Sequence, residues 1–140
     1  MNSIQQKIIG TWKLVYSVEI DNAGNKHYPF GTDALGYIMY DANGKMAVQI
    51  FRKDRKPFIS QKFTSSSKDE LVNIPQDYLA YCGNYEIDTE NELVKHHIEG
   101  HLFPNEMSKT VARKYHFFDD KMSLKPWDGT NREILWSKIV

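Results

Sequence analysis

Residues 80–103 decide the fold, and they read AYCGNYEIDTENELVKHHIEGHLF. Two runs in which residues alternate in character flank a short polar loop, and this pattern is typical of a β-hairpin. Successive side chains of a strand point to opposite faces. The second run therefore places Val94, His96 and Ile98 on one face and His97 and Glu99 on the other.

One face of this hairpin is apolar but carries polar tips. It combines aliphatic side chains with the imidazole of His96 and the hydroxyls of Tyr81 and Tyr85. The wall of a small-molecule cavity has this composition, because a few polar groups orient a ligand among apolar ones. The hairpin therefore predicts a β-structure that binds a ligand.

The rest of the chain repeats the alternation. Tight turns separate the runs, as at residues 41–44, where Asn43-Gly44 readily supplies the positive φ of a hairpin turn. No helical pattern intervenes, so the runs predict an antiparallel meander. The expected strands cover residues 11–20, 35–40, 45–51, 80–87, 93–103, 109–118, 121–125 and 133–139.

We therefore predict a single all-β domain over residues 1–140, an eight-stranded antiparallel up-and-down barrel. Closing eight strands removes the exposed sheet edges and leaves an interior wide enough for one small ligand. A short helix over residues 4–9 is expected to end at Gly10. Residues 52–79 lose the alternation and carry Pro57 and Pro75. We expect them to form a partly helical lid that covers part of the barrel mouth.

Composition excludes several classes of function. Lys+Arg and Asp+Glu number 18 each, and this balance argues against nucleic-acid binding, which needs a concentrated positive field. No apolar run approaches the roughly 20 residues of a membrane span. Cys82 is the single cysteine, and the first ten residues lack the apolar core of a signal peptide. We therefore expect a cytoplasmic protein; the sequence does not indicate an oligomeric state.

Several motifs resemble a known family. Gly10-Thr11-Trp12 resembles the Gly-x-Trp motif of lipocalins, in which a short helix plugs the barrel floor. In that fold the Trp packs beneath a basic residue near the last strand, which implies that Lys138 lies over the Trp12 indole. A longer pattern resembles the small bacterial and fungal lipocalin-like domain family and implies a calycin barrel. Its segments are residues 10–16, 28–31, 36–40, 43–50, 80–87, 96–105 and Arg113.

The candidate ligand-binding residues are those that the alternation places inside the barrel, and His96 and Arg113 are also the candidate catalytic residues. A buried guanidinium must be paired or hydrogen-bonded, yet no Asp or Glu shares these predicted inward faces. Arg113 therefore either binds an anionic ligand group or is a core arginine that pins the barrel. The full set is Tyr16, Tyr37, Met39, Val48, Tyr81, Tyr85, His96, Ile98, Arg113 and Tyr115.

Three functions are compatible with this interior. The favoured one is non-covalent binding of a small, largely hydrophobic molecule without a cofactor. The second is a cofactor-free isomerase or cyclase, in which His96 and Arg113 act on a polyketide- or fatty-acid-like substrate. The third is a filled barrel that serves as a protein-interaction module and contains no cavity above roughly 300 Å³.

A metal site is not expected. His97, Glu99 and His101 share the outward face of one strand. Histidines four residues apart on a strand are too widely spaced to chelate a metal unaided. Cys82 lies on the face opposite Tyr81, and we expect an inert thiol.

Overall fold

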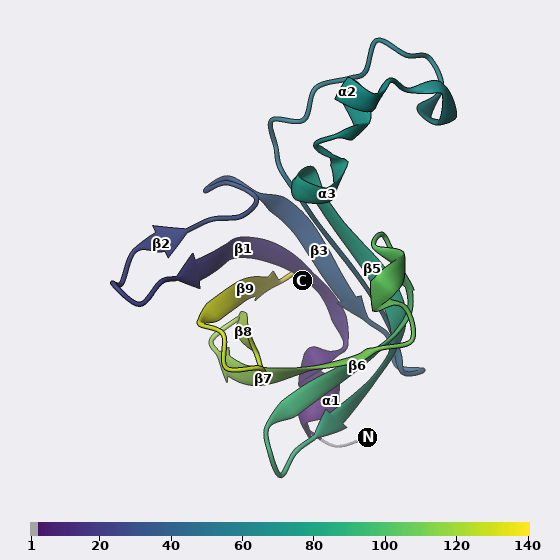
Figure 1. Cartoon of the computed structure of the whole chain (residues 1–140). Coiled ribbons are helices and arrows are strands. Elements are labelled where there is room, and N and C mark those ends of the chain that lie inside the picture. The colour runs from purple at the N-terminus through teal and green to yellow at the C-terminus, as the bar shows by residue number, and fades with distance from the viewer. Residues whose placement is uncertain (1–2) are drawn as a thin grey trace.

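Eight strands form a closed antiparallel barrel in the computed structural model, which describes residues 3–140 (Figure 1). Each of these strands pairs with the next one along the chain, and the last pairs with the first. This arrangement confirms the predicted barrel. The strands are β1 (Gly10–Ile20), β3 (Leu35–Tyr40), β4 (Lys45–Phe51), β5 (Tyr78–Asp88), β6 (Leu93–His101), β7 (Thr110–Phe118), β8 (Lys121–Pro126) and β9 (Arg132–Lys138).

A short additional strand, β2 (Lys26–His27), pairs with the end of β1. The turn between them is held by Asp21, whose carboxylate accepts hydrogen bonds from the backbone N–H groups of Ala23 and Asn25. Such local bonds are the reason that Asp favours turns. Because β2 pairs only with β1, it extends that strand without entering the barrel.

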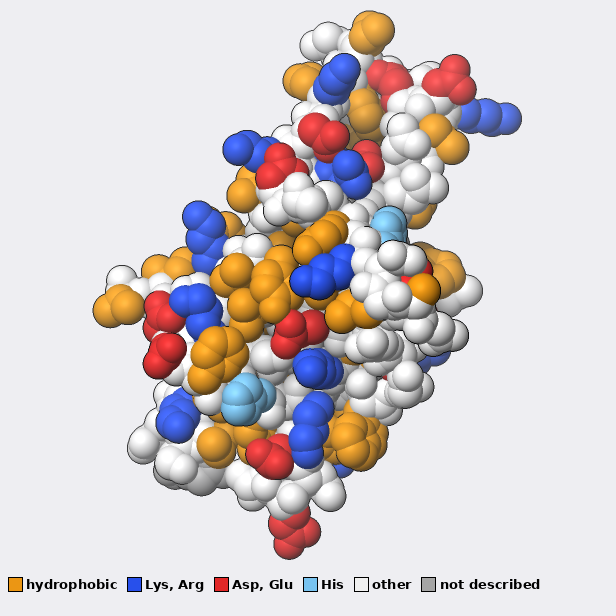
Figure 2. All heavy atoms as spheres, turned by 90° about the vertical axis from the view of Figure 1, so that its left-hand side faces the viewer, with side chains coloured by type: hydrophobic (Ala, Val, Ile, Leu, Met, Phe, Trp, Pro, Cys, Tyr) orange, Lys and Arg blue, Asp and Glu red, His pale blue; other side chains and the backbone are white. Residues whose placement is uncertain are grey.

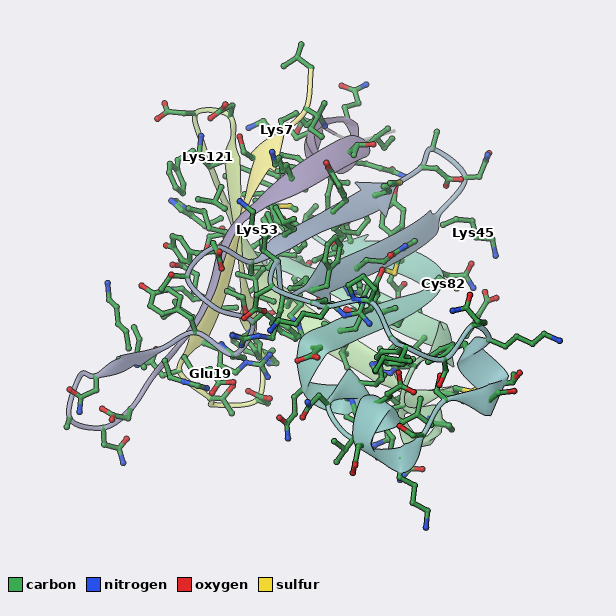
Figure 3. All side chains as sticks on the ribbon, turned by 90° about the horizontal axis from the view of Figure 1, so that it is seen from above. Lys7, Glu19, Lys45, Lys53, Cys82 and Lys121 are labelled. Carbon is green, nitrogen blue, oxygen red and sulfur yellow. The ribbon has the colours of Figure 1, made fainter. Side chains whose placement is uncertain are left out.

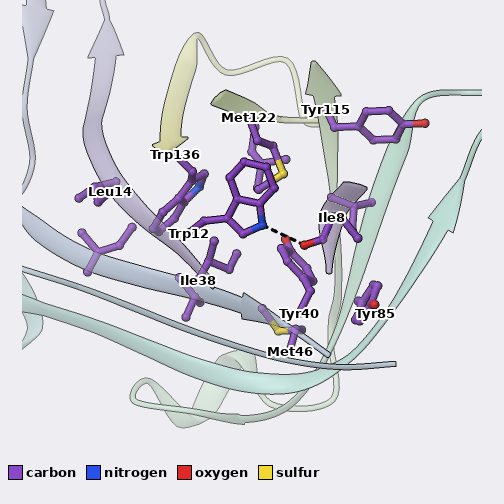
Figure 4. Packing of buried hydrophobic residues seen from close by; sticks show 14 of the residues in the cluster. Ile8, Trp12, Leu14, Ile38, Tyr40, Met46, Tyr85, Tyr115, Met122 and Trp136 are labelled. Carbon is purple, nitrogen blue, oxygen red and sulfur yellow. Dashed lines mark hydrogen bonds between the residues drawn. The ribbon is translucent and has the colours of Figure 1, made fainter. Parts of the chain in front are cut away.

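Helix α1 (Ser3–Ile8) closes one end of the barrel, as predicted. Trp12 donates its indole N–H to the carbonyl oxygen of Ile8 at 2.9 Å (Figure 4). The Lys138 ammonium lies 4.6 Å from the centre of the Trp12 ring and donates to the carbonyls of Lys7 and Ile9. The predicted cation over the indole is confirmed, and the same lysine binds carbonyls at the end of α1.

Large apolar side chains fill the barrel at this end, around Trp12 (Figure 4). Burial of each such side chain stabilises the fold by about 1.5–3 kcal/mol. We call this end the floor. Its members include Ile8, Trp12, Tyr40, Met46, Tyr85, Tyr115, Met122 and Trp136.

Strand β3 faces the opposite way from the prediction. Ile38 and Tyr40 are buried, whereas Tyr37 and Met39 are 41% and 49% exposed. The prediction that Tyr37 and Met39 point inward is therefore wrong. The run LGYIMY is apolar on both faces, so its pattern does not set the register. In the observed arrangement a Cβ atom at Gly36 would clash with the backbone carbonyl oxygen of Gln49 on β4, so glycine is required there.

A β-bulge in β1 reverses the face of Tyr16. Leu14 pairs with Trp136, but Tyr16 pairs with Leu135, so Val15 is an extra residue without a partner on β9. An extra residue shifts every later side chain to the other face. The prediction that Tyr16 points into the barrel is therefore wrong. Its hydroxyl donates to the Glu133 carboxylate on the outer face.

Residues 52–77 form an arm that projects from the barrel (Figure 1). The arm is partly helical, as predicted, with η1 (Phe63–Ser65), α2 (Lys68–Leu71) and α3 (Ile74–Asp77). The Glu70 carboxylate organises it by accepting bonds from the backbone of Ile59 and Ser67 and from the hydroxyl of Ser60. The outer part of the arm stands away from the barrel mouth, whereas the last residues of the arm lie beside the mouth. A further turn, η2 (Pro104–Glu106), follows β6.

Candidate functional site

A cavity of about 380 Å³ lies inside the barrel, toward the end opposite the floor. Figure 3 shows Lys7, in α1, and Glu19, near the end of β1, far apart. Arg132 pairs with Glu19, so the cavity opens at this distant end, the mouth. The volume lies within the usual range of ligand pockets, about 300–1,000 Å³. The apolar wall consists of Ile38, Val48, Ile50, Leu79, Ile98, Val111, Leu124, Ile134 and Trp136.

His96 lies at the centre of the polar wall, between two tyrosines. Its Nε2 is 2.7 Å from the Tyr40 hydroxyl oxygen, and its Nδ1 is 2.8 Å from that of Tyr81. Tyr81 and His96 lie on the adjacent strands β5 and β6, and Tyr40 lies on β3, which β4 separates from β5. His96 is 1% exposed, so both ring nitrogens obtain their hydrogen bonds from protein.

Burial fixes the protonation states of this group. Burial, together with the nearby charge of Arg113, lowers the pKa of His96 to about 3. Burial raises the pKa of Tyr81 to about 12 and that of Tyr40 well above its ordinary value. At neutral pH the imidazole is therefore neutral and both hydroxyls are protonated. Proton transfer is most efficient when the pKa lies near the working pH. This group is better suited to hydrogen bonding.

Two arginines supply positive charge to the cavity. Arg132 lies 3.6 Å from the Glu19 carboxylate at the mouth, and Arg113 lies deeper, on β7. Arg113 donates a 3.3 Å hydrogen bond to the carbonyl oxygen of Ala112, but it forms no ion pair with any carboxylate of residues 3–140. Its half-buried guanidinium therefore faces the cavity with most of its donors unused.

Asp128 lies opposite the arginines, in the turn between β8 and β9. Hydrogen bonds from Thr130, together with the charges of Arg113 and Arg132, lower the pKa of Asp128. The carboxylate is thus ionised and its charge is felt across the mouth. It lies too far from either guanidinium to form an ion pair.

Half of the predicted site residues meet in the cavity wall. Two others, Tyr85 and Tyr115, point into the barrel but belong to the floor. The Tyr85 hydroxyl donates to the carbonyl oxygen of Asp41 at 2.6 Å, and the Tyr115 ring packs 5.4 Å from Phe117. Tyr16, Tyr37 and Met39 lie outside the barrel. The predicted residues in the wall are Val48, Tyr81, His96, Ile98 and Arg113.

Sequence reasoning missed other members of the wall. Arg132 shares the alternation of Ile134 and Trp136, so extending the last strand by one residue would have found it. Tyr40, which supports His96 from outside the wall, was missed because β3 was placed with the wrong face inward. Trp136 was aligned correctly, and its indole N–H has no hydrogen-bond partner among residues 3–140. His101, Glu106 and Asp128 complete the polar wall, and the last two lie outside the strands.

An apolar groove of about 500 Å³ adjoins the mouth. It shares Leu79 and His101 with the cavity, so the two surfaces are continuous. Leu102 and Phe103 are 47% and 53% exposed in this groove. The remaining lining residues are Phe30, Ile74, Pro75 and Tyr78, and Ile74 and Pro75 come from the base of the arm.

The outer histidines form no metal site in the described part of the chain. His97 is already bonded to Glu86 and Thr110, each at 2.8 Å, and no three metal-ligating side chains converge within residues 3–140. Figure 2 shows Lys and Arg mixed with Asp and Glu over the arm and the barrel face below it. In the described part of the chain, no helix combines the length and the apolar character that crossing a membrane requires.

Comparison with known proteins concerns the whole barrel. The sequence model of the lipocalin-like domain family matches residues 9–138. A lipocalin-like protein from Bacteroides uniformis superposes with a TM-score of 0.52 at 10% identity, covering 95% of this chain and 99% of that one. A fatty-acid-binding protein 1 from Echinococcus granulosus gives a TM-score of 0.43 at 13% identity, covering 96% and 99%. No curated protein matches the sequence.

Proposed function

The chain belongs to the lipocalin-like domain family, and from that premise we propose that it binds a small, largely apolar molecule bearing an anionic group. The cavity of about 380 Å³ would hold the apolar part against its aliphatic wall. The adjoining groove would accept any part that extends beyond the mouth. Apolar contacts would supply the affinity, and the few polar groups would set the orientation.

The observation that carries this proposal is the state of Arg113. Arg113 forms no ion pair within residues 3–140, and its half-buried guanidinium lines the cavity with donors that a ligand can use. A carboxylate in the cavity would accept its unused donors and complete the pair. Arg132 adds positive charge on the route from the mouth. Arg132 is paired with Glu19, and Glu106 and Asp128 also line the cavity, so the unpaired donors of Arg113 are what favour a ligand acid over a cationic group.

The two alternatives have less support. A filled barrel requires an interior without a cavity above roughly 300 Å³, and the observed volume is about 380 Å³. An isomerase or cyclase requires an acid or base that titrates near neutral pH. His96, with its pKa near 3, and Tyr81, with its pKa near 12, do not meet that requirement. Binding without chemistry is therefore the function that we propose.

We propose the cytoplasm as its compartment. Cys82, the only cysteine of the sequence, is a free and exposed thiol, which suits a reducing environment.

Decanoate and decanol test this function, because they differ chiefly in charge. Isothermal titration calorimetry should show that decanoate binds more tightly than decanol. The substitution Arg113→Met should weaken decanoate binding roughly tenfold or more, which is the size expected for a charged hydrogen bond. It should leave decanol binding unchanged. Arg55→Met, on the arm, is the matched control. Equal decanoate affinity in Arg113→Met and the wild type would contradict the anionic group. Failure of the wild type to bind either compound would contradict the function.

A further inference from the structure

We infer that the Tyr81 hydroxyl is a fixed hydrogen-bond donor to the ligand, because Tyr40 and His96 hold it in that role. The inference rests on the proposed function for the ligand itself. It concerns the direction of two hydrogen bonds, Tyr40 to His96 and His96 to Tyr81, which are 2.7 and 2.8 Å long.

Two arrangements of the protons are compatible with these distances. A neutral imidazole carries one N–H donor, and its other nitrogen is an acceptor. In the first arrangement Tyr40 donates to Nε2, and Nδ1–H donates to the Tyr81 oxygen. In the second, Tyr81 donates to Nδ1, and Nε2–H donates to the Tyr40 oxygen. In each arrangement one tyrosine hydroxyl does not donate to His96. This free hydroxyl hydrogen belongs to Tyr81 in the first arrangement and to Tyr40 in the second.

The surroundings of the two tyrosines decide between these arrangements. Tyr40 is 1% exposed, lies outside the cavity wall, and has no hydrogen-bond partner except His96 among residues 3–140. A leftover hydrogen on Tyr40 would be buried without an acceptor, which is costly. Tyr81 lines the cavity, where a ligand or water can accept its hydrogen. The cost of one unsatisfied buried donor favours the first arrangement by roughly tenfold or more.

This direction of bonding narrows the class of ligand. Tyr81 presents a hydrogen to the cavity, and the nearby Arg113 also presents only donors. A ligand group at this point must therefore accept hydrogen bonds, as a carboxylate or a ketone does. A group that only donates, such as an alkylammonium, would leave both donors unpaired. Tyr81 and Arg113 therefore favour a ligand acid or ketone of suitable size over an amine.

Nitrogen-15 NMR of the imidazole rings tests the direction of bonding without any ligand. In the full-length protein near neutral pH, the His96 ring should carry its proton on Nδ1 and none on Nε2. The signal is assigned by its loss in His96→Gln. A proton on Nε2, or on both nitrogens, would overturn the inference. This measurement identifies the tautomer directly. A histidine with a purely structural role could carry its proton on either nitrogen.

Ligand binding gives the second test, by calorimetry with decanoate and decylamine. The wild type should bind decanoate and not decylamine, and Tyr81→Phe should weaken decanoate binding about tenfold. Tyr28→Phe, away from the cavity, is the matched control, and circular dichroism checks that both variants fold. Undiminished binding in a folded Tyr81→Phe would overturn the inference while leaving the proposed function intact. If the wild type binds neither decanoate nor decanol, the proposed function fails, and the NMR result still decides the tautomer.

Discussion

His96 is a neutral imidazole at a position where a charged one would be costly. The pKa of an exposed histidine is near 6.5, and burial with the charge of Arg113 lowers that of His96 to about 3. Between these two values the unfolded chain binds a proton that the folded chain does not. The contribution of His96 to stability is therefore complete above about pH 6.5 and is lost as the pH falls toward 3.

A pH titration of stability checks this sign. The free energy of unfolding should fall by about 2 kcal/mol from this group between about pH 7 and about pH 5. His96→Gln should remove most of that loss, because glutamine bonds to the tyrosines but does not titrate. His27→Gln, in the exposed strand β2, should behave like the wild type. Urea unfolding at each pH measures the effect, and an equal slope in His96→Gln would refute it.

At the residue scale, the sequence predicted several strand residues that line the cavity but not the residues that line it from the turns. His96, Ile98 and Val48 follow from alternation within well-bounded strands. Alternation was enough to predict that these side chains point inward, because only one face of each strand is apolar. Asp128 and Glu106 lie in turns, where alternation carries no information about direction. Only the folded chain brings them into the same cavity wall as the arginines.

Strand pairing depends on a close backbone approach at Gly83, in β5. A Cβ atom there would clash with the carbonyl oxygen of His97 and lie 2.9 Å from the N–H nitrogen of Glu99. The β5–β6 register also shifts between Cys82 and Gly83. Glycine in a strand marks such a bulge, because a side chain would not fit.

We therefore expect Gly83→Ala to lower the free energy of unfolding by about 3 kcal/mol, as overpacking does. Gly100→Ala is the matched control on the opposing strand, since its Cβ would meet only the Cys82 sulfur at 3.8 Å. That variant should stay within about 1 kcal/mol of the wild type. Chemical denaturation measures both. Similar stabilities for the two variants would show that the backbone yields at Gly83.

The arm depends on a single carboxylate. Glu70 accepts bonds from Ile59, Ser60 and Ser67, and these bonds, above all that from Ser60, lower its pKa to about 2. Few apolar contacts hold the arm otherwise: Ile59, Phe63 and Val72 are all well exposed. A region with few buried contacts opens locally without unfolding the barrel.

Glu70→Ala should therefore speed proteolytic cleavage within residues 52–77 severalfold and leave the thermal midpoint of the barrel unchanged. Asp69→Ala, next to it in α2, removes a carboxylate without these bonds and should be cleaved at the wild-type rate. Limited proteolysis with mass spectrometry locates the cuts. Equal cleavage of the two variants would show that the bonds of Glu70 do not order the arm.

At the element scale, alternation and turn residues predicted the strands but not always their faces. β6 was predicted correctly because polar residues occupy one face of its run. β3 was not, since LGYIMY offers an apolar side chain to either face. The bulge at Val15 was also invisible, because the residues on both sides of it are apolar or aromatic. Register in these strands depends on packing against their neighbours.

The closed barrel joins the two ends of the chain at Lys138. Its ammonium bonds to the carbonyls of Lys7 and Ile9 and lies over the Trp12 ring, so it ties α1, β1 and β9 together. Lys138→Met keeps the apolar stem and removes these interactions. We expect the free energy of unfolding to fall by about 1–3 kcal/mol. Lys13→Met, on an exposed position of β1, should change it little.

At the scale of the whole molecule, the closed barrel followed from eight alternating runs joined by tight turns. The volume of the cavity did not, because it depends on how far the floor side chains fill the interior. Trp12, Met122 and Trp136 occupy one half and leave the other free. Such packing depends on all the strands together and cannot be predicted from the sequence of any single strand.

The floor has a kinetic consequence. Trp12 and α1 close the base of the barrel, so the cavity formed by the described residues opens at one end, and a bound molecule must leave before another can enter. The exchange of one bound acid for another should then proceed at the occupant's own escape rate, however much competitor is added. Stopped-flow displacement of a fluorescent fatty acid would measure this rate. An exchange rate that increases with competitor concentration would reveal a second opening.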